Sequence, residues 1–254
     1  MPIDILSLEF LFLAAVTVIG GVMRGYAGFG SAMVISPLWA LAIDPIAAIP
    51  ALIIMELLVS AQLLPRAVRS TDWRLIGLLT IAAVVTIPVG TYFLTTLDPV
   101  IVRRVIGVVV FVWALVMLRG MRYSGRLRTS ATLGIGATSG VLMGATGLGG
   151  PPVLMYLLST PARAESNRAN IITFFGFVSV VMIVVYAAGG LYNETTLWRA
   201  GLLTPVFMIS AWVGATMFDR SSEAAFRRIA LLFLLAVGVM TLAGWDIVRA
   251  IVGV

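Results

Sequence analysis

The sequence contains no cysteine, no histidine and no lysine, so its 17 basic residues are all arginine. Without cysteine and histidine there is no disulfide, no thiol chemistry, no histidine-ligated metal and no histidine proton relay. The phosphate-binding loop of P-loop nucleotidases requires a lysine, so that class is excluded as well. We expect neither a metal nor a cofactor.

Charge is also scarce. Charged residues make up 11% of the chain, against about 25% in soluble domains, while hydrophobic residues reach 61% and the mean hydropathy is +1.09. Apolar segments joined by short turns nearly fill the 254 residues and leave no room for a soluble catalytic domain. The composition predicts an all-α, multi-pass membrane protein that is not an enzyme. Asp4 and Glu9 precede or enter the first apolar run without any base, so it is expected to be a retained helix and no signal peptide.

A glycine-rich window occurs twice, at 21–40 (GVMRGYAGFGSAMVISPLWA) and 119 residues later at 140–159 (GVLMGATGLGGPPVLMYLLS). The identical pairs are Gly21/Gly140, Val22/Val141, Gly25/Gly144, Gly28/Gly147, Gly30/Gly149, Val34/Val153 and Leu38/Leu157. A glycine inside a helix costs roughly 0.5–1 kcal/mol relative to alanine. A patterned cluster kept in two copies therefore predicts a break in a membrane helix.

The duplication extends over whole halves, since Trp73 and Arg74 recur as Trp198 and Arg199. Ten apolar segments are predicted, at 6–23, 29–43, 45–64, 73–97, 100–118, 130–143, 150–159, 167–189, 196–218 and 224–243. They divide the chain into a first membrane repeat (1–118), a basic cytoplasmic linker (119–129), a second repeat (130–244) and an interfacial tail (245–254).

The arginines predict how the segments cross the membrane. If all ten cross, one side carries Arg24, Arg66, Arg69, Arg74, Arg119, Arg122, Arg126, Arg128, Arg163, Arg168, Arg220, Arg227 and Arg228, and the other carries Arg103, Arg104, Arg199 and Arg249. This division of 13 against 4 fits the arginine excess of cytoplasmic loops, whereas two re-entrant short segments would give 9 against 8. The ten-crossing arrangement places both termini outside and inverts the second repeat relative to the first. The net charge of +6 thus reflects topology and not a nucleic-acid partner.

Two segments, 29–43 and 150–159, are shorter than the roughly 20 residues that a span needs. The glycine stretches before them are expected to cover part of the membrane depth as non-helical backbone. Inversion then points the two helix starts at each other, and their free N–H groups suit an anion. The predicted binding residues are Gly28, Phe29, Gly30, Ser31, Gly147, Leu148, Gly149, Gly150 and Pro151, with Ser31 as a helix cap. The alternative is that these glycines only allow close helix packing.

Glu56 is the only ionisable residue deep inside a predicted span, where a charge costs roughly 2.5–3.5 kcal/mol. It is therefore the candidate for coupling transport to a proton or cation; the alternative is a protonated glutamic acid bonded to a neighbouring helix. Asn167, Arg168 and Asn170 could donate to an anion from the start of their segment. The alternative for Arg168 is an ordinary positive charge on the cytoplasmic side of the membrane, with no contact to the anion.

The doubled pattern GYAGFGSAMVISPL and GATGLGGPPVLMYLL, with a basic central linker, resembles the TauE/SafE family over essentially the whole chain. The resemblance implies a transporter of small sulfur-containing anions or organosulfonates, acting by export in the bacterial inner membrane. The first copy reads GFGSA where family members often have a further glycine, which implies a narrower half-site or a hydroxyl contact from Ser31.

Three other functions compete with this prediction. GATGLGG followed by Glu165 is also similar to a dinucleotide-binding loop, but that fold requires a preceding strand in a soluble parallel sheet. A passive channel built from paired half-helices is the main alternative to a secondary transporter with alternating access. A membrane assembly factor without transport activity is the third. The substrate, the direction, the coupling ion and the oligomeric state do not follow from the sequence.

Overall fold

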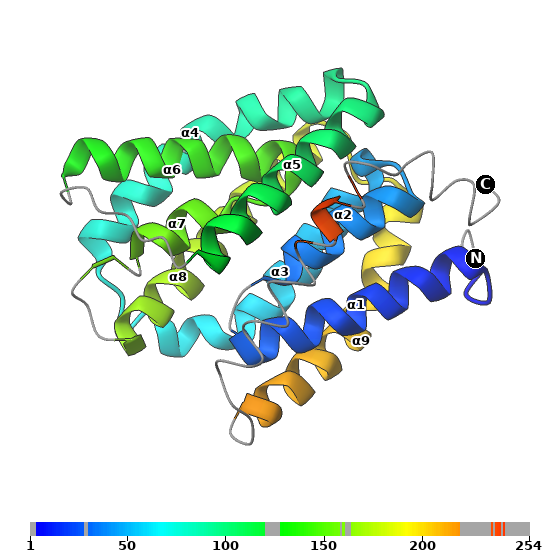
Figure 1. Cartoon of the computed structure of the whole chain (residues 1–254), viewed down its shortest axis with the longest axis horizontal. Helices are drawn as coiled ribbons and strands as arrows, with labels where there is room; N and C mark the ends of the chain where they lie inside the picture. The colour runs from blue at the N-terminus through cyan, green and yellow to red at the C-terminus, as the bar shows by residue number, and fades with distance from the viewer. Residues whose placement is uncertain are drawn as a thin grey trace.

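The computed structural model describes residues 4–27, 30–119, 128–157, 159–160, 164–218, 235, 237–239 and 241. Within these residues the regular secondary structure is entirely helical. The helices are α1 (Leu8–Ala27), α2 (Ser31–Ala42), α3 (Pro45–Ala67), α4 (Trp73–Thr96), α5 (Pro99–Leu118), α6 (Thr129–Thr146), α7 (Gly150–Leu157), α8 (Ala164–Ala188) and α9 (Glu194–Phe218) (Figure 1). Each matches a predicted segment, and the predicted tenth segment lies mostly outside the described residues.

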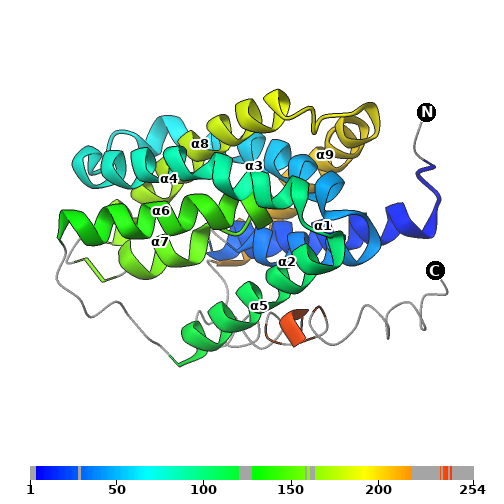
Figure 2. The same cartoon turned by 90° about the horizontal axis from the view of Figure 1, so that it is seen from above.

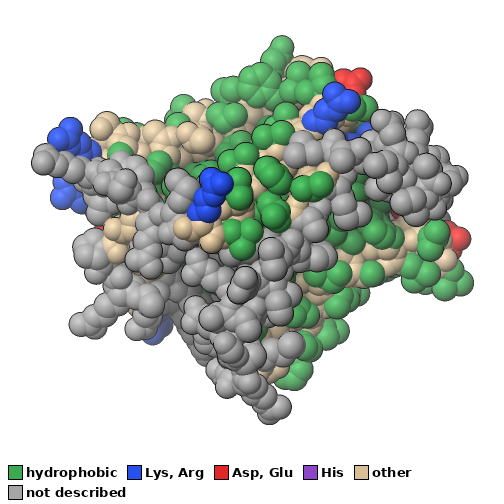
Figure 3. Space-filling model, in the orientation of Figure 1, with side chains coloured by type: hydrophobic (Ala, Val, Ile, Leu, Met, Phe, Trp, Pro, Cys, Tyr) green, Lys and Arg blue, Asp and Glu red, His purple; other side chains and the backbone are tan. Residues whose placement is uncertain are grey.

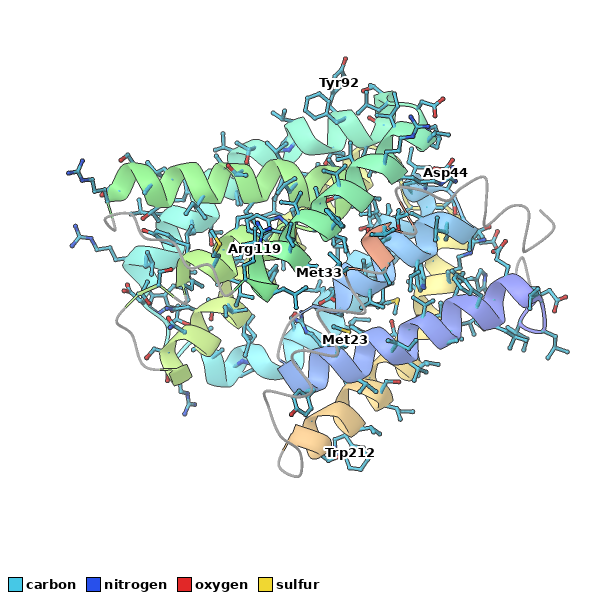
Figure 4. The ribbon with its side chains drawn as sticks, in the orientation of Figure 1. Met23, Met33, Asp44, Tyr92, Arg119 and Trp212 are labelled. Carbon is cyan, nitrogen blue, oxygen red and sulfur yellow. The ribbon has the colours of Figure 1, made fainter. Side chains whose placement is uncertain are left out.

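Five of the helices, α1, α4, α5, α8 and α9, are long and apolar enough to cross a membrane, and α2 and the Pro45–Ala61 part of α3 are shorter apolar stretches. Their outward faces are apolar too: Val85 is 70% exposed and Trp212 is 69% exposed. Figure 3 shows hydrophobic side chains over much of the visible described surface, and Figure 4 shows Tyr92 and Trp212 pointing outward. Such a surface is stable only in lipid, so the chain is a multi-pass membrane protein, as predicted.

Acidic side chains begin several helices, as expected from their affinity for free backbone N–H groups. Asp44 accepts a hydrogen bond from the amide of Ile46 at the start of α3, and Asp72 accepts from Arg74 and Leu75 at the start of α4. At the C-terminal end of a helix the partner is a base: Arg103 of α5 donates to the carbonyl of Ala40 in the last turn of α2. These hydrogen bonds help to define where the helices begin and end.

Helices α1 and α2 form one antiparallel hairpin, and α6 and α7 form another. In the first, the indole of Trp39 late in α2 donates to the carbonyl of Leu13 early in α1. In the second, the hydroxyls of Tyr156 late in α7 and Thr132 early in α6 are bonded at 2.5 Å. Because α2 has 12 residues and α7 has 8, at 1.5 Å per residue each extends over only part of a bilayer core about 30 Å thick.

The two hairpins enter the helix bundle from opposite ends of α3 (Figure 1). The open end of the first hairpin leads directly into Pro45 at the start of α3. The open end of the second leads into α8, whose early residues Ala169 and Ile172 pack against Ala67 at the end of α3. The tips meet midway, since Arg24 contacts Ser60 while Gly147 approaches Leu52. The two chain breaks are thereby brought together inside the bundle.

Each hairpin is held by a glycine face against a long helix from the other half of the chain. Helix α6 packs along α4 and α1 packs along α9, and Figures 1 and 2 both show α4 and α6 side by side. A Cβ atom on Gly140 would overlap the carbonyl of Ala83, and one on Gly25 would overlap the carbonyl of Ala211. The close-packing alternative is therefore correct for these glycines, which permit backbone approach.

We expect Gly140→Ala to lower the free energy of unfolding by about 1–3 kcal/mol, because the added methyl group must push α6 away from α4. Gly134→Ala is the matched control, since the same helix has nothing within 4 Å of that position. Alanine there should leave stability unchanged or raise it by up to about 1 kcal/mol. Thermal unfolding in detergent measures both variants, and equal effects would contradict the packing role of Gly140.

Candidate functional site

Positive backbone angles mark the two chain breaks. Gly30, directly before α2, has φ 96°, and Gly147, directly after α6, has φ 73°. Residues with a Cβ rarely adopt this left-handed conformation, so both breaks depend on glycine. The predicted interruption of the helices is therefore present in both copies. The same window thus uses its earlier glycines for packing and its later ones for the break.

The predicted capping role of Ser31 is wrong. Gly30 is the N-cap of α2 and no described side chain caps that end, while Ser31 is the first helical residue. Its hydroxyl instead donates to Oε1 of Glu56 on α3. The amides at the start of α2 thus have no side-chain cap, and the serine links this end to Glu56, the one carboxyl group among the described residues of the cavity lining.

Hydroxyl groups satisfy the exposed backbone of the second break. Ser139 donates to the carbonyl of Gly149, and Ser36 of α2 donates to the carbonyl of Thr146 at the end of α6. The Thr146 hydroxyl in turn accepts from the amide of Leu148. Unpaired backbone groups are costly within a bilayer, so these bonds allow a non-helical segment at this depth.

A small cavity of about 40 Å³ lies between the breaks. Its lining comes from both hairpin tips and from α3 and α8: Arg24, Gly30, Ser31, Ala32, Met33, Ile53, Glu56, Met143, Gly147, Leu148, Gly150, Pro151, Leu154, Ile171, Phe175 and Ser179. The first residues of α2 and α7 both border it. Two helix N-termini carry partial positive charge, so the cavity suits a negatively charged group.

A buried ion pair adds full charges to this cavity. Nη1 of Arg24 on α1 lies 2.8 Å from Oε2 of Glu56 on α3, and the two residues are each 7% exposed. Nη2 of Arg24 donates to the Ser60 hydroxyl at 2.9 Å, whereas its buried Nε has no partner among the described groups. Glu56 therefore faces the bundle interior, as predicted, and has a charged partner there.

Arg24 is the site residue that the sequence analysis missed, because it was assigned to the cytoplasmic loops. Its position inside the duplicated glycine window could have revealed it, because that window was itself predicted to lie within the membrane and not in a loop. Its counterpart 119 residues later is Met143, which also lines the cavity. Glu56 and Ser60 correspond in the same way to Phe175 and Ser179. The two charged residues of the cavity lining, Arg24 and Glu56, thus both lie in the first half of the chain.

The remaining predicted binding residues divide into three groups. Gly28 and Phe29, and the side chain of Arg168, lie outside the described residues. Gly149 is held by Ser139 just behind the lining of the cavity. Asn167 accepts from Thr160, and Asn170 accepts from the amide of Asp72, so the described bonds of this pair are made to neighbouring loops. A direct anion contact by Asn167, Arg168 or Asn170 stays a prediction.

We expect Arg24→Gln to lower the free energy of unfolding by about 3–5 kcal/mol near neutral pH, because it leaves Glu56 buried without its partner. The double variant R24Q/E56Q removes both charges and should recover most of that loss. Glu9→Gln is the control. It breaks the ion pair between Glu9 and Arg199, in which the Glu9 side chain is 47% exposed, and it should lower the free energy of unfolding by less than about 1 kcal/mol. Thermal unfolding in detergent measures these variants. Equal destabilisation of the single and the double variant would contradict an energetic coupling between Arg24 and Glu56.

The fold and the cavity define a multi-pass membrane protein with a buried, charged site where two interrupted helices meet. The chain belongs to the Sulfite exporter TauE/SafE family, whose model matches residues 13–241. A curated relative from Cupriavidus necator, described as a probable sulfite/organosulfonate exporter TauE, is 25% identical over 92% of this chain and 93% of its own length. No solved structure matches the chain significantly.

Family membership confirms the resemblance drawn from the doubled glycine pattern. It also places the chain in a family of transporters and not of enzymes, as the sequence predicted. The dinucleotide-binding alternative fails on the fold, since GATGLGG lies between two helices of a membrane hairpin and the described residues contain no strand.

Proposed function

We propose that this protein is a secondary transporter that binds a small anion, such as sulfite or an organosulfonate, in the cavity between the breaks. The observation that carries the proposal is the convergence of the α2 and α7 N-termini with the Arg24 guanidinium on one buried space. Amide groups and a guanidinium together supply the donors that sulfonate and carboxylate oxygens accept. The apolar lining, including Phe175, fits a substrate with a small organic group.

The proposed architecture is a pair of inverted repeats, 1–118 and 130–244, joined by the linker 119–129 and followed by the tail 245–254. Helix packing supports it. Under the duplication α1 corresponds to α6 and α4 to α9, so the contact of α1 with α9 is the counterpart of the contact of α6 with α4. Likewise α3 packs on its own counterpart α8. A two-fold relation between the halves would produce these pairings.

The proposed mechanism is alternating access, in which the inverted halves exchange inward-open and outward-open shapes around a fixed central site. Each hairpin packs against a helix of the other half, so each moving unit would combine a hairpin of one half with its partner helix from the other. Export follows the family description, and the bacterial inner membrane is the proposed location. Glu56 is the proposed coupling group, since it is a carboxyl group within the cavity.

Counterflow in proteoliposomes separates a transporter from the passive channel. We expect external labelled sulfite to enter faster when the vesicles contain unlabelled sulfite, and to do so with saturation, because one site must be returned to the outside in each cycle. A channel would give flux that rises with the gradient and shows no stimulation from the opposite side. That second result would favour the channel and reject alternating access.

The same assay tests the site through Gly30→Leu and Gly149→Leu, which should abolish exchange without preventing membrane insertion. Leucine at Gly30 opposes the backbone angle of 96°, and a Cβ at Gly149 would lie 2.6 Å from the carbonyl oxygen of Ser139. Gly201→Leu is the control, since nothing lies within 4 Å of that position. Normal exchange in both site variants would remove the breaks from the binding role.

The proposed topology places the N-terminus outside and the α3–α4 loop inside the cell. The absence of native cysteine allows single-cysteine labelling without background. We expect Asp4→Cys to react with a membrane-impermeant maleimide in intact cells and Ser70→Cys to react only after permeabilisation, both positions being exposed in the structure. Labelling of both residues in intact cells would contradict the proposed placement of the N-terminus and the α3–α4 loop on opposite sides of the membrane.

A further inference from the structure

The carboxylate of Glu56 lies where a bound anion would be expected. One of its oxygens is 2.8 Å from Arg24, and the other accepts from Ser31 in the first turn of α2. Arg24 is a donor that the proposed function assigns to the substrate, and Ser31 is a predicted binding residue. Resting on that function, we infer that Glu56 is a tethered occupant of the anion site, and that a substrate anion binds only when Glu56 takes up a proton and releases these donors.

Charge balance explains why release requires a proton. Among the described residues lining the cavity, Arg24 is the only cation and Glu56 the only anion, so their charges cancel. A monoanion added beside an ionised Glu56 would leave one uncompensated negative charge in a largely apolar space. Such a charge costs several kcal/mol. A proton on Glu56 restores neutrality, so one proton enters the cavity with each anion.

Arg24 is built to remain in place while its partner changes. Its Nη2 is anchored to Ser60, one helical turn beyond Glu56 on α3, so loss of the carboxylate does not free the side chain. Its Nε is buried, has no partner among the described groups, and belongs to a residue of the cavity lining. A guanidinium offers five donors in a fixed plane and binds sulfonate-like oxygens in pairs. Spare donors are thus already present for the incoming anion.

No second titratable group competes for this role among the cavity residues that the structure describes. Around the carboxylate, α1 presents Arg24, α2 presents Ser31, α3 presents Ser60, α6 presents Met143, α7 presents Pro151, and α8 presents Phe175 and Ser179. At the position corresponding to Glu56 the second half has Phe175, which carries no proton to exchange. The pH dependence of anion binding should therefore follow Glu56 alone.

Titration calorimetry of the purified protein with isethionate tests the inference. Isethionate is a sulfonate that stays fully ionised between pH 5 and pH 8, so any proton taken up on binding must go to the protein. Repeating the titration in buffers with different ionisation enthalpies gives the number of protons bound. We expect about one proton per anion in the range where Glu56 is ionised before binding, and an affinity that falls about tenfold per pH unit there.

Glu56→Gln keeps the size of the side chain and removes its negative charge. We expect this variant to bind isethionate at least as tightly as the wild type at pH 8, with no proton uptake and no pH dependence. Glu9→Gln is the matched control, since it removes a glutamate from the Arg199 ion pair and should leave both readouts as in the wild type. R24Q/E56Q, which keeps the cavity neutral, should lose binding while remaining folded.

The outcomes separate the two levels of the proposal. Wild-type binding without proton uptake, or weaker binding by Glu56→Gln with the pH dependence retained, would overturn the tethered-occupant inference and leave anion transport intact. Absence of binding and of sulfite exchange in the wild type and in Glu56→Gln alike would overturn the proposed function itself.

Discussion

The structure depends on the satisfaction of polar groups inside an apolar environment. Within a bilayer an unpaired charge or backbone amide has no water to bind, so a helix can be interrupted only where other groups take over its hydrogen bonds. Here Ser36 and Ser139 stabilise the break after α6, and Ser31 joins the break before α2 to Glu56. The Arg24–Glu56 pair then places two buried charges at the point where the hairpin tips meet.

Glycine makes this arrangement possible in two separate ways. Gly25, Gly140 and Gly144 allow the outer helices of the hairpins to touch α9 and α4 backbone to backbone, which holds the tips at a fixed depth. Gly30 and Gly147 then reverse the chain through angles that other residues rarely adopt. Close packing positions the break, and the break exposes helix N-termini to the cavity. Both interpretations of the glycine window therefore apply, since some of its glycines allow close packing and others interrupt the helix.

The two halves share this framework but differ in their chemistry. Arg24, Glu56 and Ser60 in the first half correspond to Met143, Phe175 and Ser179 in the second. The glycine window thus occurs in both halves of the chain, while the two charged residues of the cavity lining, Arg24 and Glu56, lie in the first half. This asymmetry gives the described cavity one charged side and one largely apolar side.

The sequence by itself determined the membrane class, nine helix positions and both interruptions, because apolar length, turn residues and glycine spacing act locally along the chain. It also identified Glu56, since a lone carboxyl group inside an apolar run stands out without any structure. Only the tertiary structure decided that Arg24 is its partner, that Ser31 bonds to Glu56 and caps no helix, and that Asn170 bonds to the α3–α4 loop. Those contacts arise where the hairpins fold back against α3 and α8, and residue type and spacing do not encode which side chains then meet.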